Sequence, residues 1–364
     1  MKANICFFVM AQWGYGDVIF TLKLYKLFKK WYNISPYIVS TVPDKFVING
    51  ILKSKIIQIN NKEMIYSDNR TELNLSRLSG KKFTKQFDLI FVTPVVVDGY
   101  EKDFSHFQYL FPYITKDMLY RFSAYDHTGT KYEIPMGLSK GRYGIFVSDC
   151  TQQGRLKTLK NPYIVTHISK IVYTTGIYDY INCFTKFIKL MIKKYHGVYP
   201  VLDIIIPLFI TKEPKFKKIK KYIKKYYKSV KVIYKSDTLL TNGVNFRCDL
   251  PFLPHKEYVK LFNHCLPDVL ITGNQSVSDI ISCHNNYNIY YQTLPWEVKF
   301  AKNLGILLDK PYLKKRSSAC GGEYGNRKML LLKTDSTIIK KKYNFEILGR
   351  RVINKIMKPL FQKK

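Results

Sequence analysis

The chain has 364 residues, 46% of them hydrophobic, and carries a net charge of +34. This apolar content excludes a largely disordered protein, and the length predicts two domains rather than one. No apolar run is long enough to cross a membrane as a helix, and residues 1–10 are more typical of a first strand than of a signal peptide. We therefore expect a cytoplasmic protein.

The positive charge comes mainly from lysine, because only ten of the 60 basic residues are arginine. Arginine is the usual residue for bidentate contacts to nucleic-acid bases, so this composition disfavours specific recognition of nucleic acid. Two explanations stay open: an AT-rich genome that encodes lysine wherever a solvated residue is tolerated, or peripheral contact with an anionic membrane. The seven cysteines and seven histidines lack the spacing of metal ligands, so no bound metal is expected.

Short apolar runs alternate with amphipathic stretches along most of the chain. Residues 19–32 have the spacing of a helix, and apolar runs in the same half predict strands at 5–11, 37–41, 55–60 and 88–96. In the second half, strands are predicted at 161–169, 201–210, 229–235 and 268–273. Helices are predicted between them at 183–197, 211–228 and 254–265. This alternation is typical of an α/β fold with parallel sheets built from βαβ units.

Residues 148–162 are polar and carry glycine and proline, so we place a domain boundary there. The predicted domains are residues 1–155 and residues 156–340. The tail at 341–364 is basic and amphipathic, and it either packs back on the body or lies on an anionic membrane.

The most informative segment is residues 248–291, which contains DVLITGNQSVSDIIS at 268–282. A strand ends at Gly273, and Asn274, Gln275 and Ser276 then begin a helix. The first N–H groups of a helix point outward without partners and the helix dipole adds positive charge there, which suits a phosphate or diphosphate. Asp279 follows on the same helix face, where a carboxylate can accept hydrogen bonds from a ribose. A purely structural strand–glycine–helix turn is the alternative.

The surrounding stretch, residues 248–291, resembles the nucleotide-sugar site of GT-B glycosyltransferases. The resemblance implies two Rossmann-like domains with parallel sheets that face each other across a cleft, the first for the acceptor and the second for the donor. It assigns the donor diphosphate to the helix start and the ribose to Asp279, where the family usually has glutamate. Leu253 lies in the loop that would hold the base of the nucleotide, and Glu297 follows at a position that could contact the donor sugar.

The first loop, Gly14-Tyr15-Gly16-Asp17, joins a predicted strand directly to a predicted helix. Its glycines permit a tight turn, but the G-x-G-x-x-G fingerprint of dinucleotide-binding folds is absent. The loop resembles that of heptosyltransferase-like GT-B enzymes, in which the aspartate acts as general base toward the acceptor hydroxyl. The resemblance makes Asp17 the catalytic base. Capping of the helix by Asp17 is a second interpretation, and the two are compatible.

Four other residues have both a functional and a structural interpretation. His167 and Lys170 begin the second domain and could face the cleft, although a buried histidine and a surface lysine would produce the same pattern. Asp126 and His127 lie in a polar loop that could supply acid/base groups or acceptor contacts, or could serve as an ordinary loop.

The predicted function is transfer of a sugar from a nucleotide-diphosphate donor to a hydroxyl of a glycan, lipid-linked or protein acceptor. The reaction is expected to invert the anomeric centre and to need neither a metal nor a cofactor besides the nucleotide sugar. Two alternatives stay open: a nucleotide-sugar epimerase of the same fold, and a non-catalytic basic module that binds a nucleotide or polyanion.

Overall fold

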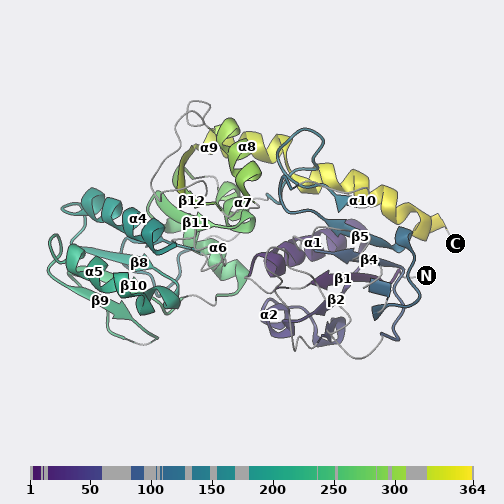
Figure 1. Ribbon diagram of the computed structural model, residues 1–364, viewed down its shortest axis with the longest axis horizontal. Coiled ribbons are helices and arrows are strands. Elements are labelled where there is room, and N and C mark those ends of the chain that lie inside the picture. Colours follow the sequence, from purple (N-terminus) through teal and green to yellow (C-terminus); the bar gives the residue numbers. More distant parts are fainter. Residues whose placement is uncertain are drawn as a thin grey trace. The chain divides into compact units, whose positions relative to one another are not determined.

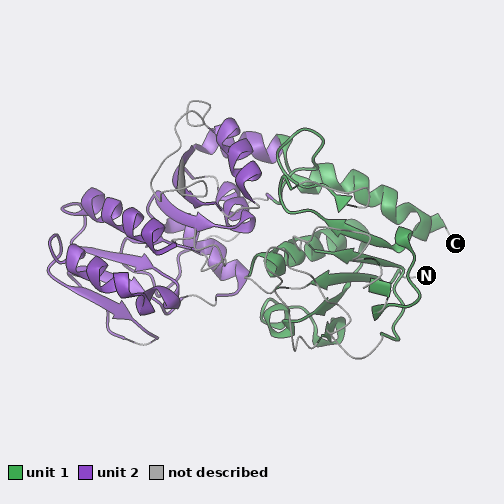
Figure 2. Ribbon diagram, viewed as in Figure 1, with its two compact units in different colours: residues 1–146, 342–364 green, residues 147–341 purple. Residues whose placement is uncertain are grey.

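The computed structural model consists of two compact units, whose elements are labelled in Figure 1 and which are coloured separately in Figure 2. Unit 1 comprises residues 1–146 and 342–364, and unit 2 comprises residues 147–341. The described residues are 3–9, 11, 15–59, 83–93, 104, 107–108, 110–127, 133–147, 154–168, 180–235, 237–250, 253–283, 285–293, 297–308 and 326–362. Two predicted site residues, Gly14 and Lys170, lie outside them.

Unit 1 is built on a six-stranded parallel sheet (Figure 1). Its strands are β1 (Ile5–Val9), β2 (Tyr37–Ser40), β3 (Ile56–Gln58), β4 (Leu89–Val92), β5 (Leu119–Phe122) and β6 (Glu133–Ile134). The order β3-β2-β1-β4-β5-β6 is that of doubly wound Rossmann-like sheets. Because every neighbouring pair is parallel, the carboxyl ends of all six strands lie at one edge of the sheet.

Helices pack on this sheet through aromatic and aliphatic side chains. β1 is buried along its whole length, as expected for a central parallel strand that is covered on both faces. Helix α1 (Gly16–Tyr32) buries the residues at helical spacing that the sequence predicted. Its Phe28 ring meets the Phe7 ring of β1 edge-on, with 5.0 Å between the ring centroids. After β2 the chain forms the short helix α2 (Pro43–Ile48).

The C-terminal helix α10 (Phe345–Gln362) is part of unit 1. Phe345 is fully buried, and its ring lies edge-on to that of Phe146 at 5.0 Å between centroids. The Tyr32 hydroxyl of α1 donates a hydrogen bond to Asn354 Oδ1 at 2.6 Å. The tail therefore packs on the body, which is the first of the two predicted alternatives.

Unit 2 contains two sheets that meet edge to edge. The first has strands β7 (Tyr163–Val165), β8 (Val201–Ile205), β9 (Val230–Ile233) and β10 (Gly243–Arg247), and the second has β11 (Asp268–Thr272), β12 (Tyr287–Gln292) and β13 (Asn326–Leu331). Their orders are β7-β8-β10-β9, all parallel, and β11-β12-β13, with β13 antiparallel. Thr166 forms a parallel bridge with Leu270, and the His167 N–H donates to the Leu270 carbonyl at 2.7 Å. β7 and β11 are therefore neighbours.

The helices described in unit 2 are α4 (Tyr180–Tyr195), α5 (Pro214–Ile223), α6 (His255–His264), α7 (Asn274–Ser282), α8 (Val298–Leu308) and α9 (Lys333–Lys342). The lysine-rich α5 buries Phe216, Ile219 and Ile223, so its apolar stripe faces the core as the spacing predicted. None of the helices in the described ranges is long and apolar enough to cross a membrane.

The apolar pattern does not predict β5, β6 or β10, because β5 and β10 each carry a buried arginine and β6 carries the glutamate that pairs with one of them. Arg121 of β5 lies 3.9 Å from Glu133 of β6, and Arg247 of β10 lies 3.0 Å from Asp203 of β8. Each charge is paired across neighbouring strands, which compensates for its burial but breaks the apolar run in the sequence.

The strand predicted at 201–210 is too long. β8 ends at Ile205, and Pro207 precedes the 3₁₀ turn η4 (Leu208–Lys212). Proline has no N–H group for a sheet ladder, so the strand stops before it although the apolar residues continue.

Candidate functional site

In unit 2 the strand order reverses between β7 and β11, so the connections from these neighbouring strands run in opposite directions. Ligands of open α/β sheets bind outside the carboxyl ends of the strands at such a switch point. His167 stands two positions after the end of β7, and Gly273 directly follows β11. The beginning of α7 and side chains of α6 lie with them, and this is the segment in which the sequence placed the donor.

Gly273 is the N-cap of α7, with φ 84° and ψ 140°. Glycine adopts this conformation far more readily than other residues do. A Cβ atom there would meet none of the described atoms within 4 Å, so backbone conformation and not crowding favours glycine. No side chain in the described part of the chain caps the helix. The start of α7 thus has the arrangement that binds phosphate groups.

Two hydroxyl groups lie against one nitrogen of the His167 ring. Nδ1 is 2.9 Å from Ser276 Oγ of α7 and 3.0 Å from the Tyr258 hydroxyl of α6. Burial lowers the pKa of His167 to about 4, although the negative charge of Asp279 acts in the opposite direction. The ring is therefore neutral at pH 7. Burial raises the pKa of Tyr258, so its hydroxyl keeps its proton.

A neutral ring carries one proton, and both neighbours of Nδ1 are hydroxyls, which can donate or accept a hydrogen bond. We assign the tautomer in which Nδ1 accepts a hydrogen bond from one of these hydroxyls and Nε2 carries the proton. Within the described ranges, no side chain is hydrogen-bonded to Nε2 of His167. His167 therefore offers one N–H donor beside the start of α7, while Ser276 and Tyr258 hold its ring in place.

Asp279 has a partner that the sequence did not predict. Its Oδ2 atom lies 3.1 Å from Nε2 of His255, the first residue of α6, and both side chains are buried, with 4% and 8% of each residue exposed. The pair joins the beginning of α6 to the middle of α7. A histidine 24 residues before an aspartate gives no periodic signal, so only the packed structure reveals it. The contact of Asp279 with a ribose stays a prediction.

The remaining predicted donor residues lie around the same edge. The Asn274 Oδ1 atom accepts a hydrogen bond from the Tyr291 hydroxyl of β12 at 3.2 Å. Gln275 is buried in the first turn of α7, and Glu297, just before α8, is 2% exposed. Leu253 is half-buried two residues before α6. Across the described residues, no three His, Cys, Asp or Glu side chains gather as a metal site requires.

In unit 1, Asp17 lies at the carboxyl edge of the sheet, in the first turn of α1. Tyr15 and not Asp17 is the N-cap, and no described side chain caps the helix, so the capping interpretation is wrong. Gly16 begins the helix. Burial raises the pKa of Asp17 to about 7. In the part of unit 1 that the structure describes, no group forms a hydrogen bond or ion pair with its carboxylate.

Asp126 has a structural role in unit 1. The residue is fully buried at φ 57°, and its Oδ1 atom accepts hydrogen bonds from Leu138 N and Ser139 N at 2.9 Å and from Ser139 Oγ at 2.6 Å. A Cβ atom on Gly137 would lie 2.2 Å from that oxygen. Asp126 thus anchors the loop at 136–139, as the structural interpretation expects. A chemical role for Asp126 or His127 stays a prediction.

Comparisons with known proteins support the fold. No protein-family model matches the sequence, and no curated protein matches it either. A Listeria monocytogenes structure assigned as a UDP-N-acetylglucosamine 2-epimerase is similar over 100% of this chain and 98% of its own, with 8% identity and a TM-score of 0.50.

Two further structures belong to sugar transferases. An alpha-glucosyltransferase solved with UDP and a 13-mer DNA covers 97% of this chain and 99% of its own, with 11% identity and a TM-score of 0.47. An E. coli heptosyltransferase solved with ADP-2-deoxy-2-fluoro heptose covers 80% and 89%, with 8% identity and a TM-score of 0.37. The fold is of the GT-B type. The predicted α/β fold with parallel sheets in both units is confirmed by the strand orders and by the similarity to the Listeria structure, and at these identities the likeness shows the fold alone.

Proposed function

We propose that the protein is a glycosyltransferase that moves a sugar from a nucleotide-diphosphate donor to an acceptor hydroxyl. The observation that carries this proposal is the group at the switch point of unit 2. There the glycine-capped start of α7 lies beside the neutral His167 ring, which Ser276 and Tyr258 hold. These groups offer hydrogen bonds and partial positive charge, both of which suit a diphosphate. No carboxylate of the described residues is hydrogen-bonded to the His167 ring, so none competes with the diphosphate for it.

In the proposed reaction, the acceptor oxygen attacks the anomeric carbon of the sugar while the bond from that carbon to the donor phosphate breaks. The acceptor proton passes to a base, and the nucleoside diphosphate leaves with the bonding electron pair. The N–H groups of α7 and the Nε2–H group of His167 would stabilise the charge that develops on this leaving group. Attack from the opposite side inverts the anomeric centre. No metal or cofactor besides the nucleotide sugar takes part.

Asp17 is the proposed base. A general base works best when its pKa lies near the pH of the reaction, and burial raises the pKa of Asp17 to about 7. A carboxylate without a hydrogen-bond partner can accept a proton without first breaking another interaction. Asp126 is less suited to this role, because its Oδ1 atom accepts three hydrogen bonds that hold the loop at 136–139.

The other contacts to the donor follow from the resemblance of residues 248–291 to the nucleotide-sugar site of GT-B glycosyltransferases. Asp279 is proposed to bind the ribose, with His255 orienting its carboxylate. The backbone near Leu253 would hold the base of the nucleotide, and Glu297 would contact the donor sugar. The acceptor hydroxyl is proposed to belong to a glycan, a lipid-linked sugar or a protein.

The test is thermal unfolding of the purified chain with UDP-, GDP-, ADP-, CMP- and dTDP-sugars. A ligand that binds only the folded state at 100 times its Kd adds about 2.7 kcal/mol of stability, which raises Tm by several degrees. We expect such a shift with one nucleotide, its loss in His167→Ala and its retention in His264→Ala, an exposed histidine at the end of α6. No shift with any nucleotide sugar would overturn the proposal. Release of an epimerised or hydrolysed sugar would instead identify an epimerase.

A further inference from the structure

Unit 1 carries a half-buried lysine, Lys45, that the proposed reaction does not use. Lys45 belongs to α2, which begins at Pro43 soon after β2 ends at Ser40. Asp17 follows β1 in the same way. Because β1 and β2 are adjacent and parallel, both connections leave the sheet at the same edge. The segments that carry Lys45 and Asp17 therefore both begin at the carboxyl edge of the sheet.

The Lys45 side chain is positioned by an aromatic ring. Its Nζ atom lies 5.1 Å from the centroid of the Tyr15 ring, within the range of a cation–π contact. The Tyr15 hydroxyl in turn accepts a hydrogen bond from Asn49 Nδ2 at 3.2 Å, which ties the ring to the end of α2. Tyr15 is also the N-cap of α1, two residues before Asp17.

Among the described residues, Lys45 lacks the anionic partner that several other lysines have. Lys30 pairs with Glu346, and Lys194 pairs with Asp268. In the described part of unit 1, no carboxylate lies within ion-pair distance of Lys45. Burial lowers the pKa of Lys45, which means that its charged form is partly desolvated. Holding an ammonium group in this way costs free energy unless an anion compensates it.

A second polar group at the same edge has no partner among the described residues. The Thr41 Oγ1 atom, between β2 and α2, is buried and makes no hydrogen bond to them. Buried hydroxyls are normally hydrogen-bonded. The Thr41 hydroxyl lacks such a partner among the described residues and lies at the same edge as Lys45, so we infer that a ligand oxygen binds there. Both groups suit an anion with several oxygens.

We propose that Lys45 and Tyr15 form a subsite for a carboxylate or phosphate group of the acceptor. This inference rests on the proposed function and narrows its substrate class to acceptors that carry a negative charge close to the reactive hydroxyl. An ammonium group provides a point charge that serves either anion. The anion would fix the acceptor on the face of unit 1 from which Asp17 accepts the proton.

The experiment is a ligand-detected NMR titration of the full chain with glucose, glucuronate and glucose 6-phosphate. We expect both charged sugars to bind the wild type more tightly than glucose by about tenfold or more, as for hydrogen bonds to charged groups. The better of the two identifies the anion. Lys45→Met should abolish this preference and Lys45→Arg should retain it. Lys53→Met, which removes an exposed lysine of the η1 turn (Lys53–Lys55), should not affect it.

The nucleotide-sugar shift in Tm is measured on the same variants. If the wild type binds a nucleotide sugar but shows equal affinity for the three probes, or if Lys45→Met keeps the preference, this inference is overturned while the proposed function stands. If no nucleotide sugar binds, the proposed function fails. An unchanged or higher Tm of Lys45→Met without ligand excludes misfolding as the cause of a lost preference.

Discussion

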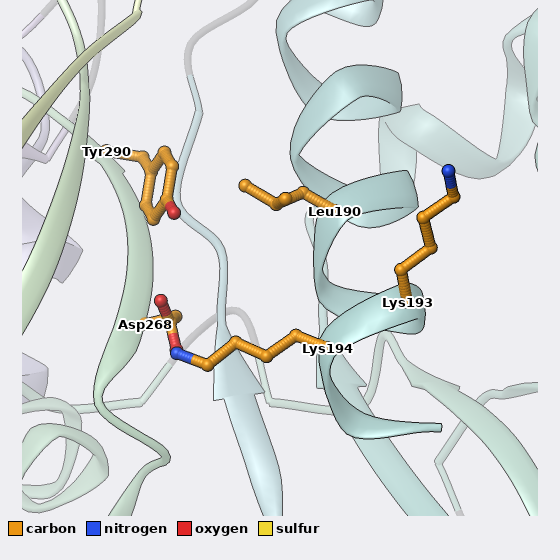
Figure 3. Close-up of a pocket in the computed structure, with 5 residues that line it drawn as sticks. All are labelled: Leu190, Lys193, Lys194, Asp268 and Tyr290. Carbon is orange, nitrogen blue, oxygen red and sulfur yellow. The ribbon is translucent and has the colours of Figure 1, made fainter. Parts of the chain in front are cut away.

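Two carboxylates, Asp268 at the start of β11 in unit 2 and Asp17 in the first turn of α1 in unit 1, have opposite surroundings. Asp268 begins β11, is 1% exposed, and accepts hydrogen bonds from Lys194 Nζ at 2.5 Å, from Asn288 Nδ2 at 3.1 Å and from the Tyr195 hydroxyl. Figure 3 shows the Lys194 ammonium group on this carboxylate, at a pocket of about 420 Å³. Leu190 and Tyr290 also line the pocket.

The carboxylate of Asp17 has no such partner in the described part of unit 1, and burial raises its pKa to about 7. A buried carboxylate that is surrounded by donors contributes to the structure, because each donor compensates part of the cost of burying its charge. A carboxylate that is half-buried without donors, as Asp17 is, exchanges its proton near neutral pH. The comparison teaches that the hydrogen-bond partners of a carboxylate withdrawn from water separate a structural role from a chemical one.

The largest effect is expected from Asp17→Asn, which keeps the shape of the side chain but cannot accept a proton. Loss of a general base lowers kcat by about 10²–10⁴-fold. Wild-type kcat/KM should rise as pH increases through about 7, because the carboxyl group then loses its proton. In Asp17→Asn this pH dependence should vanish. The measurement is transfer of sugar from the nucleotide sugar found in the binding test, between pH 5 and 9.

The matched control is Asp44→Asn, which changes an exposed carboxylate in the first turn of α2. Stability provides a second check. The pKa of Asp17 is raised in the folded state above its unfolded value near 4, so the folded chain binds this proton more tightly and loses stability as pH rises from about 4 to about 7. Asp17→Asn should therefore gain in Tm over the wild type at pH 8 but not at pH 4. Activity that survives Asp17→Asn would assign the base elsewhere.

A comparable effect, on stability instead of activity, is expected from Arg247→Met in unit 2. Arg247 is 2% exposed and donates to Asp203 Oδ2 at 3.0 Å and to both oxygens of Asp249, at 2.8 and 2.6 Å. Breaking a buried pair leaves an uncompensated charge and costs about 3–5 kcal/mol. The free energy of unfolding, measured with urea, should fall by this amount.

Two further variants test the explanation. Asp203→Asn added to Arg247→Met should recover part of the loss, because it removes the orphaned carboxylate. Lys217→Met, an exposed lysine of α5, should change the free energy of unfolding by less than about 0.5 kcal/mol. If Arg247→Met were as stable as Lys217→Met, the buried network would contribute no stability.

The difference between paired and unpaired charges also explains what the sequence could predict. Local patterns predict the strands of unit 1 up to β4, the lysine-rich helix α5, and the strand–glycine–helix segment around Gly273, because these depend on residues close together in the chain. The strands β5 and β10, which carry a buried arginine, cannot be predicted in this way, since the partner that compensates the charge lies on a neighbouring strand.

The same limit applies to the site. The position of Ser276 at a helix start follows from the sequence, but its contact with His167 joins residues 109 positions apart, and that of Tyr258 with His167 joins residues 91 positions apart. The sequence singled out His167 without showing which groups orient its ring. The raised pKa of Asp17 depends on packing around it, which no local pattern encodes.

The smallest effect is expected from Tyr258→Phe, which removes one of the two hydroxyls that hold the His167 ring. Ser276 Oγ remains 2.9 Å from Nδ1, so the tautomer with the proton on Nε2 should persist and only part of the orientation is lost. One hydrogen bond contributes about 0.5–1.5 kcal/mol, so the affinity for the nucleotide sugar should fall by up to about tenfold. Calorimetric titration measures the affinity, and ¹⁵N shifts of the His167 ring report the tautomer. Tyr234→Phe, at an exposed tyrosine after β9, is the control. A proton on Nδ1 in the wild-type ring would reverse the assignment, because Nε2 would then be an acceptor that repels the diphosphate.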